Sequence, residues 1–542
     1  MKNYRNLFFA LIGVCLCTAD LMAQNNIDKS QQPNILFCIA DDASFEHISS
    51  YGYAHNKWVE TPNFDTIAKE GLLFLNAYTP NAKCAPSRSS ILTGRNPWQL
   101  EAAANHNPIF PAKFTTVMEA LEKNGYLVGY TGKGWAPGDQ GEINGNPRSL
   151  TGKAYNELKL KSPTAEISPI DYASNFELFL ADRETNQPFM FWYGGFEPHR
   201  NYEYGTGAIM GEKSINDIQR VPPYWPDNEV VRNDMLDYAY ELEYFDLHLG
   251  RIFQSLKDRG ELENTIIVVT SDNGMPFPRV KGHTYETANH LPLAVMWKGG
   301  IINSGRQIED FVSFIDFAPT FLELAGISQK NSGMQKIEGK SFLDILKSNQ
   351  GNFIDPSRDH VIIGRERQDV GRPNDQGYPV RGIVKNNFIY TQNFEPERWP
   401  SGNPETGYMD TDGSPTKTEI LKMYRTHKDS TYWQLAFGKR GSEELYNLTE
   451  DEYGMSNLSN EPECKKIKEE LRKVLMNELT LQKDPRILGK GEVFDNYPYS
   501  NKNVRNFYKR FMNGEKIKTN WINDEDYEKG NQIKIKDKKI KQ

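Results

Sequence analysis

Apolar runs and amphipathic segments alternate along the first two thirds of the chain. Continuous apolar runs bounded by polar residues are typical of strands buried on both faces, whereas apolar residues at helical spacing predict helices. The predicted strands are 34–40, 126–131, 188–194 and 265–271, the predicted helices are 61–71, 115–124 and 234–259, and the segments 291–297 and 311–326 continue the alternation. Strands alternating with helices predict a mostly parallel sheet covered by helices on both faces.

Polar residues follow each of the predicted strands. In sheets of this kind ligands bind beyond the carboxyl ends of the strands, so these polar residues are expected to share one site. The runs are Asp41-Asp42, Gly132-Lys133, Glu197-Pro198-His199-Arg200 and Asp272-Asn273-Gly274.

The character of the chain changes after about residue 379, where polar residues, Gly, Pro and short strand-like runs become more frequent. A strand-like run at 443–448 and a helix at 462–479 indicate a small α+β domain. We therefore expect an α/β domain over 33–380, a smaller C-terminal α+β domain with an antiparallel sheet over 381–514, and a polar, Lys-rich tail with little order over 515–542.

The N-terminus predicts export from the cell. Lys2 and Arg5 precede an apolar run at 7–16 that is too short to span a bilayer, and a cleavage site at 21–23 makes residues 1–23 a signal peptide. The mature protein is expected to be periplasmic or secreted, without a transmembrane span; an uncleaved anchor is the alternative. A net charge of −8 argues against nucleic-acid binding.

The most informative motif runs from Cys84 to Arg95. Cys84 is a small nucleophile at the start of a predicted helix, where anions are attracted, and Arg88 is a permanent cation one turn further on. A buried cysteine beside a structural arginine is the ordinary alternative. The whole run resembles the signature Cys-x-Pro-Ser-Arg-x-x-x-Leu-Thr-Gly-Arg of the formylglycine-dependent sulfatases in the alkaline phosphatase superfamily. The resemblance covers about 33–460 and implies an alkaline phosphatase-like fold.

The resemblance also implies a modified residue and a metal. In that family a maturation enzyme oxidises the motif cysteine, here Cys84, to formylglycine, whose hydrate attacks sulfur. Asp41, Asp42, Asp272 and Asn273 would bind calcium, with formylglycine 84 completing the shell, while Arg88 holds its hydroxyl and Asp272 takes its proton. An all-oxygen set suits calcium and, less well, magnesium. Taken alone, Asp-Asp and Asp-Asn-Gly are also common in turns and loops.

Lys133 and Lys281 are expected to clamp the sulfuryl group, and His199 to donate a proton to the departing oxygen or nitrogen. A solvated lysine and a structural histidine are the ordinary alternatives. Most sulfatases have a histidine two residues after the clamp lysine, where this chain has Trp135. An indole cannot act as a base. In most sulfatases this histidine orients formylglycine and helps to release sulfate. In this chain either His106 or His283 takes that role, or Lys133 acts alone.

The runs Pro198-His199-Arg200, 271–278 and 378–381 most resemble the heparan N-sulfatase (sulfamidase) branch. The leading substrate is therefore N-sulfoglucosamine in a glycosaminoglycan such as heparan sulfate. Arg381 is expected to bind a sugar carboxylate or sulfate; an interdomain salt bridge is the alternative. Three other functions remain open: an O-sulfatase for another polysaccharide, a phosphoryl-transfer relative, and a non-catalytic sulfated-glycan-binding protein.

Overall fold

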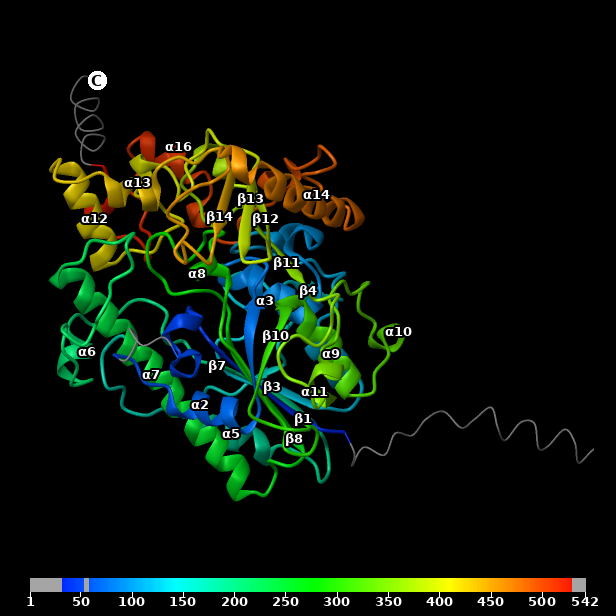
Figure 1. Cartoon of the computed structure of the whole chain (residues 1–542). Coiled ribbons are helices and arrows are strands. Elements are labelled where there is room, and N and C mark those ends of the chain that lie inside the picture. Colours follow the sequence, from blue (N-terminus) through cyan, green and yellow to red (C-terminus); the bar gives the residue numbers. More distant parts are fainter. Residues whose placement is uncertain (1–31, 53–57, 529–542) are drawn as a thin grey trace, which may run out of the picture.

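An eight-stranded sheet with the order β10-β2-β9-β8-β1-β7-β3-β6 forms the centre of the molecule (Figure 1). The structure is a computed structural model and describes residues 32–52 and 58–528. Neighbouring strands run parallel except at β9, which is antiparallel to both β2 and β8. The strands are β1 (Asn34–Ala40), β2 (Leu72–Tyr78), β3 (Leu127–Gly132), β6 (Lys153–Ala154), β7 (Phe189–Gly194), β8 (Thr265–Ser271), β9 (Leu293–Met296) and β10 (Arg306–Ser313). The predicted mostly parallel sheet is confirmed.

Helices cover both faces of this sheet. Leu36 and Cys38 of β1 belong to one hydrophobic core, and Ile35 and Phe37 belong to a second core on the opposite face. This burial on both faces explains why the strands are continuous apolar runs in the sequence. The first core includes residues of α2 (Pro62–Glu70), α5 (Tyr172–Ala181) and α7 (Glu229–Asp258), and the second includes residues of α3 (Cys84–Thr93), α4 (Val117–Lys123) and α9 (Phe317–Leu324).

The long helix α7 begins earlier than the apolar pattern predicts. The expected start was residue 234, but the helix begins at Glu229 because Asn228 caps it. The side-chain oxygen of Asn228 accepts a hydrogen bond from the backbone N–H of Val231 at 3.2 Å. An N-cap of this kind satisfies a donor that the first turn of a helix otherwise leaves unpaired. The prediction for this boundary was therefore wrong by a little more than one turn.

A smaller antiparallel sheet with the order β11-β12-β13-β14 lies beside the large one (Figure 1). Its strands are β11 (His360–Arg365), β12 (Val380–Lys385), β13 (Phe388–Asn393) and β14 (Glu443–Asn447). Helix α14 (Lys465–Leu481) packs its apolar side, including Leu471 and Leu475, against this sheet. The predicted fold class is confirmed. β11 precedes residue 380 yet pairs with β12, so this sheet begins within the segment assigned to the first domain; the domain division itself stays a prediction.

Residues 515–528 pack against the rest of the protein. The Trp521 indole donates to the carbonyl of Met409 at 3.0 Å, and Asp526, which is fully buried, forms an ion pair with Lys417 at 3.3 Å. Tyr527 is also buried. The expectation of little order was wrong for these residues, because a few aromatic and acidic side chains anchor an otherwise polar segment. The predicted signal peptide at 1–23 lies outside the described residues. Across 32–52 and 58–528, no helix is long and apolar enough to cross a membrane.

Candidate active site

Two neighbouring strands bring four oxygen-bearing side chains together. β1 and β8 are parallel, and their last residues, Ala40 and Ser271, are paired in register. Asp41 and Asp42 therefore emerge beside Asp272 and Asn273, as the sequence predicts. The backbone N–H of Asp42 donates to Asp272 Oδ1 at 3.1 Å, and Asn273 Nδ2 donates to Asp42 Oδ1 at 2.7 Å.

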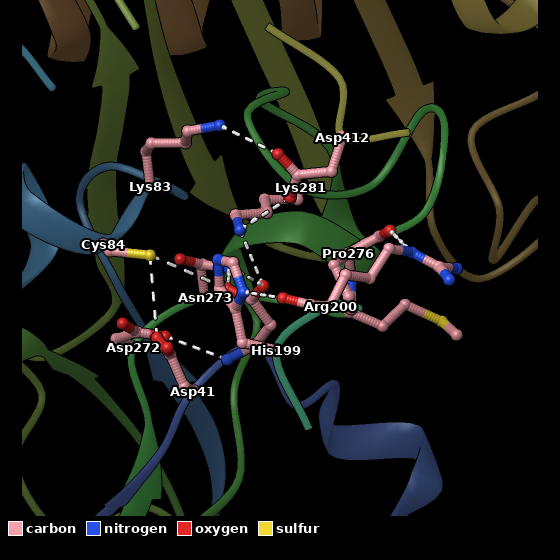
Figure 2. Close-up of polar contacts among 12 residues, drawn as sticks. Asp41, Lys83, Cys84, His199, Arg200, Asp272, Asn273, Pro276, Lys281 and Asp412 are labelled. Atoms are coloured by element: carbon pink, nitrogen blue, oxygen red, sulfur yellow. Dashed lines mark hydrogen bonds and ion pairs between the residues drawn. The ribbon is translucent and has the colours of Figure 1, made fainter. Parts of the chain in front are cut away.

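Cys84 lies at the start of α3 and faces this carboxylate cluster (Figure 2). Its Sγ is 3.6 Å from Asp41 Oδ1 and 3.8 Å from Asp42 Oδ1. Lys83 is extended and precedes the helix, and Pro86 lies in the first turn, where proline is tolerated. Burial raises the pKa of the Cys84 thiol well above its usual value, although Lys133 opposes this. The unmodified side chain is thus a neutral thiol and a poor nucleophile.

The fully buried guanidinium of Arg88 joins three segments of the site. Its Nε donates to Asp272 Oδ2 at 2.8 Å, and its second terminal nitrogen donates to Asp41 Oδ1 at 3.1 Å. The remaining contacts go to the backbone carbonyls of Lys133 at 2.9 Å and Gly134 at 2.8 Å. A planar group with fixed donors suits this task. Arg88 therefore holds the ends of β1, β3 and β8 at a set distance from α3.

Two lysines and a histidine complete the cluster. Lys133 Nζ lies 2.6 Å from Asp41 Oδ2, and Lys281 Nζ lies 2.7 Å from Asp42 Oδ2. His199 Nδ1 is 2.6 Å from the carbonyl of Arg200, so it donates there, and Nε2 is 3.8 Å from Asp42 Oδ2 (Figure 2). Burial favours the neutral form of Asp41, but Lys133, His199 and Arg88 outweigh it and hold the pKa of this carboxyl below its usual range.

The cluster fits a hard divalent cation. Ligand atoms of Asp41, Asp42, Cys84 and Asp272 all lie within 4.8 Å of one another. Within the described part of the chain, Asn273 Oδ1 is buried and has no hydrogen-bond partner. A buried amide oxygen without a donor is well suited to coordinate a cation. Carboxylate and amide oxygens are the ligands that calcium and magnesium prefer.

The cluster opens into a pocket of about 510 Å³ whose far wall comes from the C-terminal part of the chain. Asp369 and Asp412 lie on this wall. Lys83 Nζ is 3.2 Å from Asp369 Oδ2. Lys281 Nζ is 2.8 Å from Asp412 Oδ2 (Figure 2). The sequence reasoning missed Lys83, Asp369 and Asp412. Lys83 adjoins the motif, but the two aspartates lie in irregular segments without a motif or periodicity.

Not every predicted residue reaches the pocket. Arg381 is fully buried, with Nε 2.7 Å from Asp484 and one terminal nitrogen 2.7 Å from Glu366, and it is not among the residues lining the pocket. These contacts match the alternative, a buried salt bridge, and not the expected contact with a sugar. The Trp135 indole lines the pocket but donates to Ser89 Oγ at 2.8 Å.

His106 and His283 occupy different surroundings. His106 lines the pocket, with Nδ1 3.1 Å from Asp369 Oδ1. His283 does not line it: Nε2 is 3.2 Å from Ser401 Oγ, and burial together with nearby Arg365 lowers the pKa of its imidazole well below the usual value. His283 is therefore a structural residue.

Comparisons with known proteins identify the family of this chain. The sequence profile of the family described as Sulfatase matches residues 33–327. An ulvan-active sulfatase of Formosa agariphila is 25% identical over 559 residues, which cover 91% of this chain and 84% of that protein. The N-sulphoglucosamine sulphohydrolase of Homo sapiens is 26% identical over 473 residues, covering 82% of this chain and 89% of that protein.

A solved structure, that of a protein in complex with its substrate D-glucosamine-2-N,6-O-disulfate, superposes with a TM-score of 0.58 at 21% identity. The match covers 84% of this chain and 98% of that one, and it supports the fold. Because the matched sequence profile spans more than half of the 542 residues, the chain belongs to the sulfatase family.

Proposed function

We propose that this sulfatase hydrolyses sulfate groups on sulfated glycans, with Cys84 converted to formylglycine and calcium held by Asp41, Asp42, Asp272 and Asn273. The observation that carries the proposal is the position of Cys84 Sγ, 3.6 Å from Asp41, in a pocket that also holds Lys133 and Lys281. Burial raises the pKa of the Cys84 thiol, which leaves less thiolate for direct attack by an unmodified cysteine.

Formylglycine would supply a hydrated aldehyde whose oxygen attacks sulfur, and the cation would polarise the sulfuryl group. The protein's own residues supply the rest. Lys133 and Lys281 neutralise charge on the sulfuryl oxygens, and both are fixed by carboxylates of the cluster. With its Nδ1–H held by the Arg200 carbonyl, His199 donates a proton from Nε2 to the departing oxygen or nitrogen when its ring carries a hydrogen on both nitrogens. Asp272 accepts the proton that the attacking group loses.

The lining of the pocket supports a sugar as the molecule that carries the sulfate group. Tyr130, Phe196, Tyr499 and Trp521 line it, and aromatic rings of this kind can pack against the apolar faces of sugars. N-sulfoglucosamine is the leading unit, in keeping with the name of the human relative. An O-sulfate of another polysaccharide is the second candidate, because the Formosa agariphila relative is named for ulvan.

We also infer export to the periplasm or the medium, and separate domains over 33–380 and 381–514.

Two measurements test the proposal. Mass spectrometry of the peptide that contains residue 84, from protein made in its native host, should detect formylglycine; unmodified Cys84 there would instead favour a non-catalytic glycan-binding protein. Sulfate release should then be measured on a panel of N-sulfated and O-sulfated mono- and disaccharides. Cys84→Ala should release no sulfate, whereas Cys464→Ala, a free cysteine far along the chain, should match the wild type. Full activity of Cys84→Ala would refute the assignment of the nucleophile.

A further inference from the structure

One polar atom of the pocket wall lacks a partner. Among the pocket-lining side chains in the described ranges, His106 is the one with a buried nitrogen, Nε2, that makes no hydrogen bond. His106 as a whole is 8% exposed. Leaving a buried polar atom unpaired costs free energy. In a binding pocket, such an atom indicates a contact that a ligand completes.

The imidazole of His106 is fixed from the other side of the ring. Nδ1 lies 3.1 Å from Asp369 Oδ1, and the backbone N–H of His106 donates to the carbonyl of Arg367 at 3.0 Å. Asp369 is itself held by the Tyr499 hydroxyl at 2.9 Å and by Lys83 at 3.2 Å. The ring therefore has its orientation before any ligand binds.

These contacts determine which nitrogen carries the hydrogen. Burial favours the neutral form of Asp369, but Lys83 and His106 outweigh it and hold the pKa of this carboxyl below its usual range. An ionised carboxylate only accepts hydrogen bonds, so His106 Nδ1 is the donor. Burial also lowers the pKa of His106, against the opposing effect of Asp369, and this favours the neutral ring. Its Nε2 consequently presents a lone pair and acts as an acceptor.

An acceptor cannot bind the sulfate group, whose oxygens also only accept. In the described ranges, no hydrogen bond or ion pair joins His106 to Cys84, Asp41 or Lys133. His106 instead lies beside Tyr499, because both side chains contact Oδ1 of Asp369, and an aromatic ring in the pocket can pack against the apolar face of a sugar. Most of the donors that a glycan offers to such a wall are its hydroxyl groups.

We propose that His106 Nε2, oriented by Asp369, accepts a hydrogen bond from a ring hydroxyl of the sugar that carries the sulfate. His106 is thus a specificity-determining residue, and Asp369 is a positioning residue. This inference rests on the proposed glycan function and extends it to the sugar.

The test measures binding with turnover removed. Calorimetry in the Cys84→Ala background compares intact His106 with His106→Phe, which keeps a ring of similar size but has no acceptor. The ligands are the sulfated monosaccharide that the wild-type enzyme hydrolyses and its monodeoxy analogues. His360→Phe is the matched control, because His360 Nδ1 also contacts an aspartate, Asp359, at 2.6 Å but His360 does not line the pocket.

With His106 intact, one deoxy analogue should bind about 10-fold more weakly than the parent sugar. In His106→Phe the parent sugar should also bind about 10-fold more weakly. Its affinity should then differ from that of the same deoxy analogue by less than about twofold. His106→Asn, which withdraws the acceptor from the pocket, must give the same pattern if the Phe variant does not fold. The proposal would be overturned if the difference in affinity between the parent sugar and each deoxy analogue were the same with and without His106. It would also be overturned if every analogue bound more weakly by the same factor. Absence of binding by any sulfated sugar, with no sulfate release by the wild type, would instead refute the glycan function.

Discussion

Replacing Arg381 by methionine distinguishes a salt bridge from a sugar-binding residue. Arg381 Nε is 2.7 Å from Asp484, and its other contacts are with Glu366 at 2.7 Å and the backbone carbonyls of Arg365 and Val380 at 3.1 and 3.0 Å. Glu366 keeps a second cation, Arg486, at 2.6 Å. Within the described part of the chain, the Asp484 carboxylate keeps only the hydrogen bond from the backbone N–H of Arg486, at 3.0 Å.

The expected loss of stability follows from these contacts. Arg381→Met leaves the Asp484 carboxylate fully buried without its cation, and removing one partner of a buried pair costs about 3–5 kcal/mol. Adding Asp484→Asn should recover part of this loss, because the uncompensated charge disappears. Lys439→Met is the control. Its partner Glu397 lies 3.4 Å away and is almost fully exposed, and such pairs contribute about 0.2–1 kcal/mol.

Urea unfolding followed by tryptophan fluorescence gives the free energies, and initial rates of sulfate release give KM. We expect the KM of Arg381→Met to stay within about twofold of the wild type, since one hydrogen bond to a ligand would change it by more. A variant of unchanged stability whose KM rises 10-fold would show that Arg381 contacts substrate and that the salt-bridge assignment is wrong.

Three further predictions address the site and the fold. Lys133→Ala should lower kcat/KM by about 100- to 1000-fold and weaken inhibition by free sulfate, because Lys133 is a fixed cation beside Asp41; unchanged kinetics would remove it from the site. Removing divalent cations with EGTA should abolish sulfate release and lower the thermal midpoint, and added calcium should restore both, since the cluster carries several like charges; full activity in EGTA would exclude the metal. Burial raises the pKa of Asp246 to about 6 despite hydrogen bonds from the start of α2, so its contribution to stability is present at pH 4 and lost as the pH rises through 6. Asp246→Asn should therefore make the slope of the free energy of unfolding against pH between 4 and 6 more positive than in the wild type, because it removes a contribution that falls with pH; an equal slope would contradict this assignment.

The positions of the central strands and of the metal-binding candidates could be predicted because each depends on short stretches of sequence. β1 and β8 have the predicted boundaries, since burial on both faces leaves a continuous apolar run. Parallel pairing then brings Asp41 and Asp272 together without further information. The motif at Cys84 is also a short stretch of sequence, and it predicted both the start of the helix and the position of Arg88 one turn further on.

The far wall of the pocket could not be predicted, for a physical reason. Asp369 and Asp412 lie in segments whose conformation depends on contacts far along the chain, such as Lys83 with Asp369. Trp521 lies in a segment of mostly polar residues. One indole, which donates to the Met409 carbonyl, does not make the composition of that segment typical of a folded one. The salt bridge of Arg381 could not be predicted because its partner Asp484 is about one hundred residues away, and no local pattern joins the two.

Lys281 links these two kinds of structure. Its ammonium lies between Asp42, at the end of β1, and Asp412, on the C-terminal wall, at 2.7 and 2.8 Å. A change at Asp412 would alter the charge around Lys281 and hence the sulfuryl clamp, whereas a change at His106 would act on the sugar through Nε2. The wall is therefore not uniform: Asp412 contacts a lysine at the strand ends, whereas His106 Nε2 makes no hydrogen bond within the described chain. We therefore expect a substitution at position 106 to change the preference for the sugar while the reaction at residue 84 stays the same.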